Sequence, residues 1–278
     1  MSEDASTTRK SFDLRAALRF RSTTDVNPQG KHTANVILGT TVICLLVYLF
    51  LGYPDFYYMV FKVPHFVLTG LNSTQAEYWY VKIYYNWGMA TLLFFVVPYL
   101  VARKLGIGVR DCGVKVGNWK IGLPLMVLGL VLVPVFAQSY LTDPQALANY
   151  PLLRPFADWN QFGYPSFNGG LWFLGEFSYV VIYYIPYEYF WRGFAQIPLR
   201  KHGKINTFWI VLWTTCLTTI VHLPVPLLEL EGAVLLGIII GWLALKTDSI
   251  IYGLVFHAAV GLGTDFLSTA VVNGWTTI

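Results

Sequence analysis

The amino-acid sequence predicts an all-α protein, a polytopic bundle of about seven transmembrane helices. Hydrophobic residues make up 55% of the 278 residues and charged residues only 12%, whereas soluble domains carry about 25% charged residues. The mean hydropathy is +0.53. The apolar residues gather in runs of about 20, which is long enough to cross a hydrocarbon layer of about 30 Å. The predicted spans are 35–53, 82–102, 121–139, 170–200, 206–223, 231–246 and 249–271.

The first 80 residues differ in character from the rest of the chain. Residues 1–34 are polar and basic and predict a cytosolic tail, without the early apolar region of a cleavable signal peptide. Residues 35–80 add the first span and a second apolar segment, 56–70, which a lysine, a proline and a histidine interrupt. We expect this segment to be interfacial or re-entrant, with an eighth crossing as the alternative. Residues 81–278 form the predicted core, without a linker that would divide them.

Basic residues set the predicted orientation. If the N-terminus is cytoplasmic and the seven spans alternate, all lysines and arginines but Lys62, Lys82 and Arg154 fall on the inner side. Positive charge gathers on the cytoplasmic side of membrane proteins. The loop 223–231 carries Glu229 and Glu231 and is predicted to face outward. We therefore expect an integral protein of the plasma (inner) membrane with a cytoplasmic N-terminus.

The other composition signals exclude several classes of protein. The three cysteines, Cys44, Cys112 and Cys216, include no CxxC pair, so neither a disulfide framework nor a zinc cluster is indicated. The net charge of +4 follows from the loops and does not suggest nucleic acid as a partner. A P-loop and a G-x-S-x-G motif are both missing from the sequence. The lipid bilayer is the one partner that composition predicts.

The stretch PYEYFWRGF, residues 186–194, places two opposite charges inside the fourth span. Glu188 lies 12 residues before Arg200, which together with Lys201 marks the inner surface. At 1.5 Å per residue, Glu188 is about 18–20 Å above that surface. Arg192 is one turn nearer the inside, on almost the same helix face. A structural ion pair and a functional site explain these two residues equally well.

Two histidines are also predicted at membrane depth. His222 lies about 24 Å along the fifth span from Asn206, and His257 about 12 Å along the seventh span from Ser249. One histidine in a span is usually a hydrogen-bonded structural residue. Ionisable groups on three different spans are costly and more often mark a site.

A carboxylate and two imidazoles at membrane depth suit the hydrolysis of an amide. The carboxylate of Glu188 would take a proton from water, and His222 and His257 would orient that water and stabilise the oxyanion. No cofactor is required. Zinc bound by these three residues is the less favoured alternative, since the histidines lie on different helices and no HExxH is present. A serine or cysteine nucleophile has less support, because Cys216 lies off the face of His222.

Three stretches in the second half of the chain resemble a known family. EYFWRG, IVHLP and KTDSIIYGLVFHA are similar to the motifs of the CPBP family of intramembrane proteases, which includes CAAX prenyl protease 2 and bacteriocin-processing and bacteriocin-immunity proteins. GVRDCGVKVGNWKIGL (108–123) resembles the cytosolic loop of that family. The resemblance covers roughly residues 100–270. It implies a bacterial-type intramembrane endopeptidase that acts on a membrane-associated protein or peptide.

The family pattern is Glu-Glu-x-x-x-Arg, then His, then His-x-x-x-Asn. The resemblance implies that Glu188 is the second glutamate and pairs with Arg192, that His222 assists the activation of water, and that His257 stabilises the oxyanion. Two positions depart from the pattern. Tyr187 stands where the family has its water-activating glutamate, and Gly261 where it has an oxyanion-binding asparagine. Glu188 is therefore expected to take over the base, unless the site no longer cleaves.

Two other functions fit the same residues. A non-catalytic relative that binds a membrane protein or peptide, in immunity or assembly, is favoured by the two departures from the family pattern. A small transporter would also need buried charges, but inverted repeats and paired broken helices are missing from the sequence.

Overall fold

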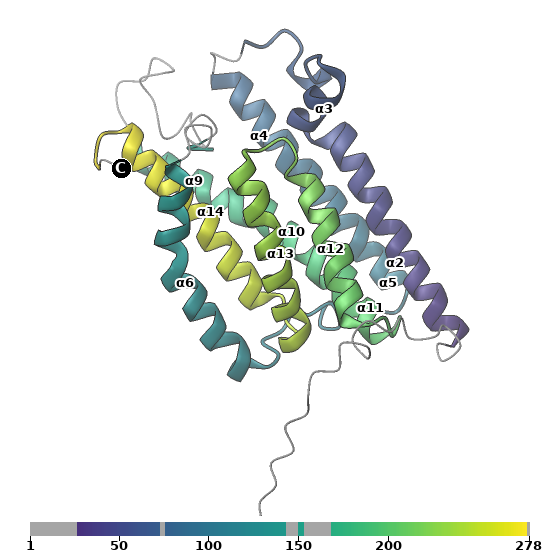
Figure 1. Ribbon diagram of the computed structural model, residues 1–278. Helices are drawn as coiled ribbons and strands as arrows, with labels where there is room; N and C mark the ends of the chain where they lie inside the picture. The colour runs from purple at the N-terminus through teal and green to yellow at the C-terminus, as the bar shows by residue number, and fades with distance from the viewer. Residues whose placement is uncertain (1–26, 73–75, 143–149, 153–167, 277–278) are drawn as a thin grey trace, which may run out of the picture.

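The computed structural model describes residues 27–72, 76–142, 150–152 and 168–276, and the regular structure of these residues is entirely helical (Figure 1). The cytosolic tail predicted for 1–34 lies mostly outside the described residues. The elements are α2 (Pro28–Val47), η2 (Tyr48–Gly52), α3 (Pro54–Phe61), η3 (Phe66–Leu68), α4 (Ala76–Thr91), η4 (Leu92–Val96), α5 (Val97–Lys104), α6 (Trp119–Leu141), α9 (Gly169–Tyr179), η6 (Val180–Tyr184), α10 (Ile185–Glu188), η7 (Tyr189–Gln196), α11 (Ile197–Lys201), α12 (Thr207–Val221), α13 (Leu227–Thr247) and α14 (Ile251–Val272).

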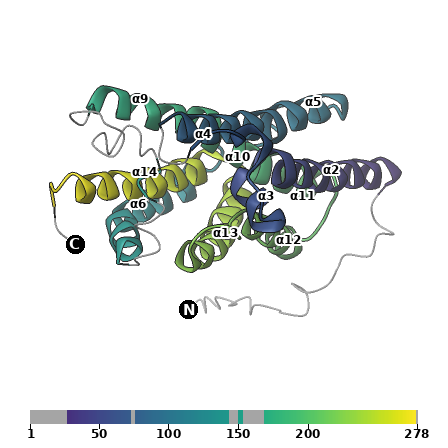
Figure 2. The same ribbon diagram turned by 90° about the horizontal axis from the view of Figure 1, so that it is seen from above.

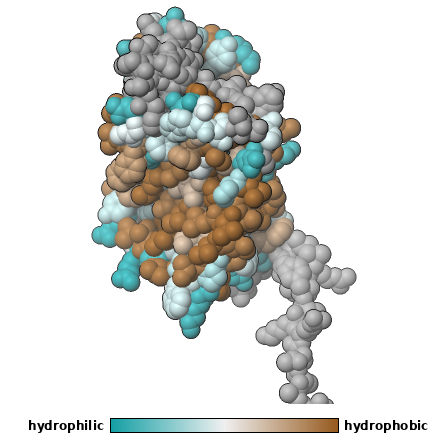
Figure 3. All heavy atoms as spheres, turned by 90° about the vertical axis from the view of Figure 1, so that its left-hand side faces the viewer, coloured by the Kyte–Doolittle hydropathy of each residue, from teal (hydrophilic) through white to brown (hydrophobic). Residues whose placement is uncertain are grey.

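These elements join into the seven long helices that the sequence predicts. η2 continues α2, η4 links α4 to α5, and the elements from α9 to α11 follow one another without a break. Five of the helices in the described residues are long and apolar enough to cross a membrane, and α12 is a shorter apolar helix. On the face that Figure 3 shows, hydrophobic atoms cover the middle of the molecule and hydrophilic atoms lie above and below them. The chain is an integral membrane protein with a helical bundle fold.

The segment predicted to be interfacial does not cross the bundle. It forms α3, which has 8 residues, and the single turn η3. A helix of that length spans only about 12 Å. Lys62 ends α3 in the left-handed conformation, with φ 57°, and the chain turns back at the end of the bundle where α4 begins (Figure 1). An eighth crossing is therefore not formed.

Several helices begin earlier than the apolar runs predict, and the first and sixth show why. The first starts at Pro28, because the side chain of Asn27 accepts a hydrogen bond from the Gly30 amide and proline suits the first turn. The sixth starts at Leu227, so Glu229 and Glu231 belong to a helix and not to the predicted outer loop. Acidic residues in a first turn interact favourably with the helix dipole, which explains why the polar stretch still folds as helix.

The middle part of the composite helix from α9 to α11 lies at the centre of the bundle. Viewed from above, α10 sits between a layer that contains α9, α4 and α5 and a layer that contains α6, α13 and α12 (Figure 2). Every residue from 186 to 199 is buried. Phe190 stacks on Phe94 of η4, with ring centroids 4.5 Å apart. The charged pair predicted inside the fourth span is thus in the protein core and not at a lipid-facing surface.

The central helix contains two π-helical segments, η6 and η7, on either side of α10. A π turn is wider than an α turn and leaves backbone groups without their usual partners. The hydroxyl of Thr91 donates to the Ile182 carbonyl at 2.6 Å, and the Gln196 amide donates to Thr214 at 2.5 Å. Hydrogen bonds to neighbouring helices thus hold both segments, through a backbone carbonyl in η6 and a side chain in η7.

Helix α14 approaches the bundle closely through small residues of α6. A Cβ atom at Gly122 would overlap the ring of Tyr252, and one at Gly129 would lie 2.7 Å from the ring of Phe256. Small residues let membrane helices approach without the help of a hydrophobic driving force. This contact holds α14 in place one residue before His257.

A cluster of charges joins the loop 105–118 to the turn between α13 and α14. Asp248 ends α13 in the left-handed conformation, with φ 55°. Its carboxylate pairs with Lys115, with Lys201 at 2.7 Å and with Arg200 at 3.8 Å. The Ile250 amide donates to the Gly113 carbonyl at 3.0 Å. The last turn of the central helix and the start of α14 are therefore held at one level.

Replacing Asp248 by asparagine is expected to lower the unfolding midpoint in detergent at neutral pH. Asparagine tolerates the left-handed backbone, so the change removes the charge and leaves three cations close together. Partly exposed ion pairs are worth about 0.2–1 kcal/mol each, so we expect a loss on the order of 1–2 kcal/mol. Asp55→Asn, which breaks one exposed pair with Lys82, is the matched control and should cost less.

The same difference should depend on pH. Partial burial raises the pKa of Asp248, but the hydrogen bonds and charges of Lys115 and Lys201 outweigh it and lower the pKa below its ordinary value. A carboxyl group with a depressed pKa stabilises the fold above its ordinary pKa of about 4, and this contribution disappears as the pH falls through the lower value. Thermal unfolding of the wild type and Asp248→Asn should converge in acid. A gap that does not narrow as the pH falls below about 4 would contradict the electrostatic explanation.

Candidate active site

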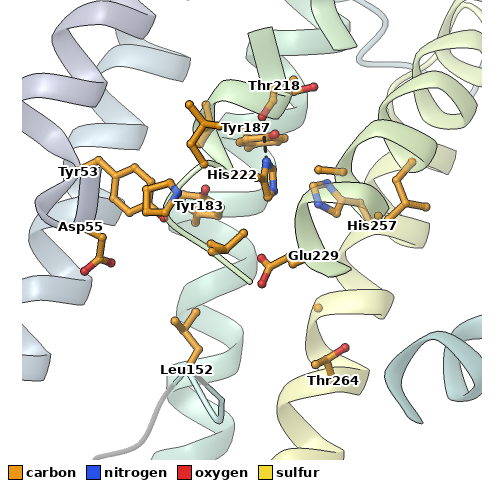
Figure 4. A pocket seen from close by; sticks show the side chains of 18 of the residues that line it. Tyr53, Asp55, Leu152, Tyr183, Tyr187, Thr218, His222, Glu229, His257 and Thr264 are labelled. Atoms are coloured by element: carbon orange, nitrogen blue, oxygen red, sulfur yellow. Dashed lines mark hydrogen bonds between the residues drawn. The ribbon is translucent and has the colours of Figure 1, made fainter. Parts of the chain in front are cut away.

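A cavity of about 900 Å³ lies inside the bundle, at the end where α3 turns back. Its wall is built from α3, α4, η6, α10, α12, α13 and α14. Figure 4 shows the rings of His222 and His257 beside each other at this cavity, with Tyr187 next to them and Glu229 reaching toward the same space from α13. The predicted histidines therefore converge, although 35 residues separate them in the sequence.

Glu188 binds both Arg192 and His257. Its Oε1 atom lies 2.7 Å from Nδ1 of His257 and 3.4 Å from Nη1 of Arg192. The side chain of Glu188 is fully buried, that of Arg192 is 4% exposed and that of His257 is 18% exposed. The guanidinium group beside it lets the carboxylate keep its charge away from water. Glu188 is thus a buried orienting group behind His257, and His257 is the member of the pair that lines the cavity.

His222 lies at the end of α12 and is held by its own helix. Its Nδ1 atom is 2.8 Å from the carbonyl oxygen of Thr218, one turn earlier. The backbone amide of His222 donates to the carbonyl oxygens of Thr219 and Ile220, which ends the regular α-helical pattern. Two prolines follow within the next four residues, and the helix stops here. The ring therefore stands at the cavity wall and is not buried between helices.

The partners of the two rings determine where their protons lie. A backbone carbonyl and a carboxylate only accept hydrogen bonds. Nδ1 of His222 therefore donates to Thr218, and Nδ1 of His257 donates to Glu188. In the neutral ring the other nitrogen, Nε2, is then unprotonated. Both histidines consequently offer a proton acceptor at the cavity, and neither offers a donor until it is protonated.

Tyr187 fills the space between the two histidines and the buried arginine. Its ring makes edge contacts with His257 at 5.4 Å and with His222 at 6.4 Å, measured between centroids. The guanidinium of Arg192 lies 6.0 Å from the same ring. The position is 2% exposed. Tyr187 packs the site as an aromatic wall where the family pattern has a carboxylate.

Gly261 lies one turn after His257 and touches the side chain of Tyr184. A Cβ atom at position 261 would overlap the Tyr184 hydroxyl. The ring of Tyr184 also contacts His257 edge-on, with centroids 5.0 Å apart. The volume that an asparagine side chain would fill at position 261 is therefore not empty, because the hydroxyl of Tyr184 from η6 occupies it.

The zinc alternative finds little support in the donor arrangement. Among the described residues, no three histidine, cysteine, aspartate or glutamate side chains are grouped as metal ligands. The three predicted ligands instead bind one another or the backbone through the atoms given above. Zinc thus remains a prediction without a site that fits it.

Sequence reasoning missed three residues of the cavity. Thr218 holds His222 through its carbonyl, and Glu229 reaches into the cavity from α13 (Figure 4). Tyr184 contacts the ring of His257. Tyr184 could have been found, because it precedes Glu188 by four residues and such positions share a helix face. Glu229 could not, because its stretch looked like a loop.

Part of the chain matches a known protein family. Residues 170–262 match a family model described as Rce1-like: Type II CAAX prenyl endopeptidase Rce1-like. The match contains Glu188, His222 and His257 and ends one residue after Gly261. The chain matches no curated protein and no solved structure. The resemblance inferred from the sequence is confirmed over these residues.

Proposed function

We propose that this protein is an intramembrane endopeptidase that hydrolyses a peptide bond of a membrane-associated protein or peptide. One observation carries the proposal. Within the segment that matches an endopeptidase family, a fully buried glutamate binds Nδ1 of a histidine whose ring lines a cavity inside the bundle. A carboxylate that orients an imidazole toward a cavity is a recurring arrangement for proton transfer.

The geometry favours His257, and not Glu188, as the group that contacts water. Nε2 of His257 takes a proton from a water molecule while the water oxygen bonds to the carbonyl carbon of the substrate. Glu188 stabilises the imidazolium that forms, and Arg192 keeps Glu188 ionised. The imidazolium then gives its proton to the amide nitrogen as the C–N bond breaks. The products are a carboxylic acid and an amine.

In this proposal His257 binds one hydrogen of the reacting water and His222 binds the other. The unprotonated Nε2 of His222 accepts a hydrogen bond, so that the water presents a lone pair to the carbonyl carbon. Tyr187 excludes bulk water from the space between the two rings, which strengthens the interaction between Glu188 and the imidazolium. The roles of Glu188 and His257 are thus exchanged relative to those expected from the family pattern.

A membrane-embedded substrate suits the position of the cavity. The cavity is lined mainly by aromatic and aliphatic residues, with a few charged side chains that include Asp55, Glu229 and Glu231. The matched family is described by its action on CAAX prenyl proteins. A peptide tethered by an apolar helix and a peptide with a farnesylated C-terminus are therefore the two probes of first choice. We place the protein in the plasma membrane with its N-terminus in the cytoplasm, on the distribution of basic residues.

The proposal is tested by turnover in liposomes. The full chain is reconstituted with quenched-fluorescence peptides of randomised sequence, each carrying one of the two anchors. Wild-type protein should release fluorescence with at least one anchor type, and His257→Ala should not. Binding of peptides without cleavage, at equal levels for the wild type and His257→Ala, would instead support the alternative function of a peptide-binding relative.

Restoring the family pattern separates the enzyme from the binder. Tyr187→Glu with Gly261→Asn introduces the missing carboxylate beside Arg192 and the missing amide beside His257. Because an asparagine side chain at position 261 would displace Tyr184, we expect the rate of the double variant to be unchanged or reduced. The measurement is turnover of the same peptides, with each single variant as a control. Cleavage that rises from zero in the double variant would contradict the proposed enzyme and support the binder.

A further inference from the structure

The proposed reaction needs a hydrogen-bond donor for the oxyanion, and the histidines do not supply one. As the carbonyl carbon becomes tetrahedral, negative charge develops on its oxygen, and a preorganised donor stabilises that charge. Nε2 of neutral His222 and of neutral His257 carries no proton, because Nδ1 of each ring already donates to Thr218 or Glu188. A further donor on the cavity wall is therefore required.

Several donors on that wall already have acceptors within the protein. The Thr218 hydroxyl donates to the Thr215 carbonyl at 3.0 Å, and the Thr264 hydroxyl to the Val260 carbonyl at 2.9 Å. The amide of Asn86 donates to Tyr48 and to the Gly52 carbonyl. Arg192 also lines the cavity, but its guanidinium pairs with the carboxylate of Glu188 at 3.4 Å.

Tyr184 has the position that the reaction requires. It lines the cavity, and its ring touches the ring of His257. Its hydroxyl lies against Gly261, one turn further along α14 on the same face as His257. Any larger residue at position 261 would push this hydroxyl away. The hydroxyl is also one helix turn from Glu188 along the central helix, so the donor and the proton acceptor are fixed to the same rigid element.

We infer that the Tyr184 hydroxyl donates a hydrogen bond to the oxyanion formed during peptide hydrolysis, in a space that Gly261 keeps open. This inference rests on the proposed function and adds a catalytic residue to it. The substrate carbonyl would then lie between Tyr184 and His257, with its oxygen toward α14 and its carbon toward Nε2. Tyrosine donates its proton only as a hydrogen bond, so the reaction balance given above is unchanged.

The test uses Tyr184→Phe, which removes the hydroxyl and keeps the ring. Loss of one oxyanion donor typically lowers kcat about 10²–10³-fold, and KM should change little. The matched control is Tyr179→Phe. Tyr179 lies one turn earlier, lines the same cavity and packs on Tyr184 with centroids 4.5 Å apart. If the Tyr184 hydroxyl only holds Tyr179 in place, the two variants should lose the same activity.

A second measurement isolates the oxyanion. A phosphinate peptide, whose P–O⁻ group mimics the tetrahedral intermediate, should bind Tyr184→Phe about 10²-fold more weakly than it binds the wild type. The parent peptide should bind both equally. If the wild type cleaves the peptides and Tyr184→Phe cleaves them at the same rate, this inference is overturned and the proposed function is not. No turnover by the wild type would overturn the proposed function and this inference with it.

Discussion

Replacing Glu188 by glutamine is expected to lower turnover about 10³–10⁴-fold, in line with the loss seen when the orienting carboxylate of a histidine is neutralised. Glutamine can still reach Nδ1 of His257, but its NH₂ group can donate, which favours the tautomer with the proton on Nε2. That tautomer cannot accept a proton from water. The imidazolium that forms in the transition state also loses its counter-charge. Turnover of the anchored peptides by the full chain measures the effect.

Glu176→Gln is the matched control for Glu188→Gln. Glu176 is 5% exposed and lies on α9, earlier along the same composite helix, but does not line the cavity. It interacts with Asp265 of α14, and glutamine can keep a hydrogen bond to that carboxyl group. We expect this variant to keep its activity. Full activity of Glu188→Gln in a folded protein would exclude Glu188 from the mechanism.

Replacing Arg192 by methionine is expected to destabilise the folded protein by about 3–5 kcal/mol, the usual cost of leaving one partner of a buried ion pair without the other. Glu188 would keep the hydrogen bond from His257 but lose the guanidinium that neutralises its charge. Every residue from 186 to 199 is buried, so the carboxylate of Glu188 has little access to water that could replace the charge of the arginine. The unfolding midpoint in detergent measures the loss.

The double variant Glu188→Gln with Arg192→Met should recover part of that stability and none of the activity. Both charges are then gone, and a buried pair replaced by uncharged residues of similar size is often neutral for stability. A double-mutant cycle separates the pair from the individual side chains. If Arg192→Met is as stable as the wild type, the guanidinium does not stabilise the carboxylate, and our account of the buried charge is wrong.

The depth of the charged residues could be predicted only approximately. Counted at 1.5 Å per residue, Glu188 should stand about 18–20 Å and His257 about 12 Å above the inner end of their helices. The two side chains nevertheless meet at 2.7 Å. Arg200 and Asp248 pair at the inner end, so both helices start from one level. The π-helical segment η7 reduces the expected difference in height between Glu188 and His257, because a π-helix has more residues per turn and rises less per residue.

The sequence predicted only some of the partners of the buried polar groups. Glu188 and Arg192 pair because they are four residues apart on one helix, and this was predictable. The contact of Glu188 with His257 depends on how closely α14 approaches the central helix, which Gly253 and Gly261 of α14 permit. That approach leaves Glu188 behind His257. His257, and not Glu188, is therefore the group that we propose takes the proton from water.

By itself the sequence determined that this is a membrane-spanning helical protein with ionisable groups on three helices, because apolar run length and the cost of buried charge are local properties. Its likeness to an endopeptidase family was also readable from short motifs. The tertiary structure decided which of those groups reaches the cavity, which nitrogen of each histidine is unprotonated, and which hydroxyl stands over Gly261. Those properties depend on contacts between residues distant in the chain, and helix packing and π turns set such contacts to within an ångström.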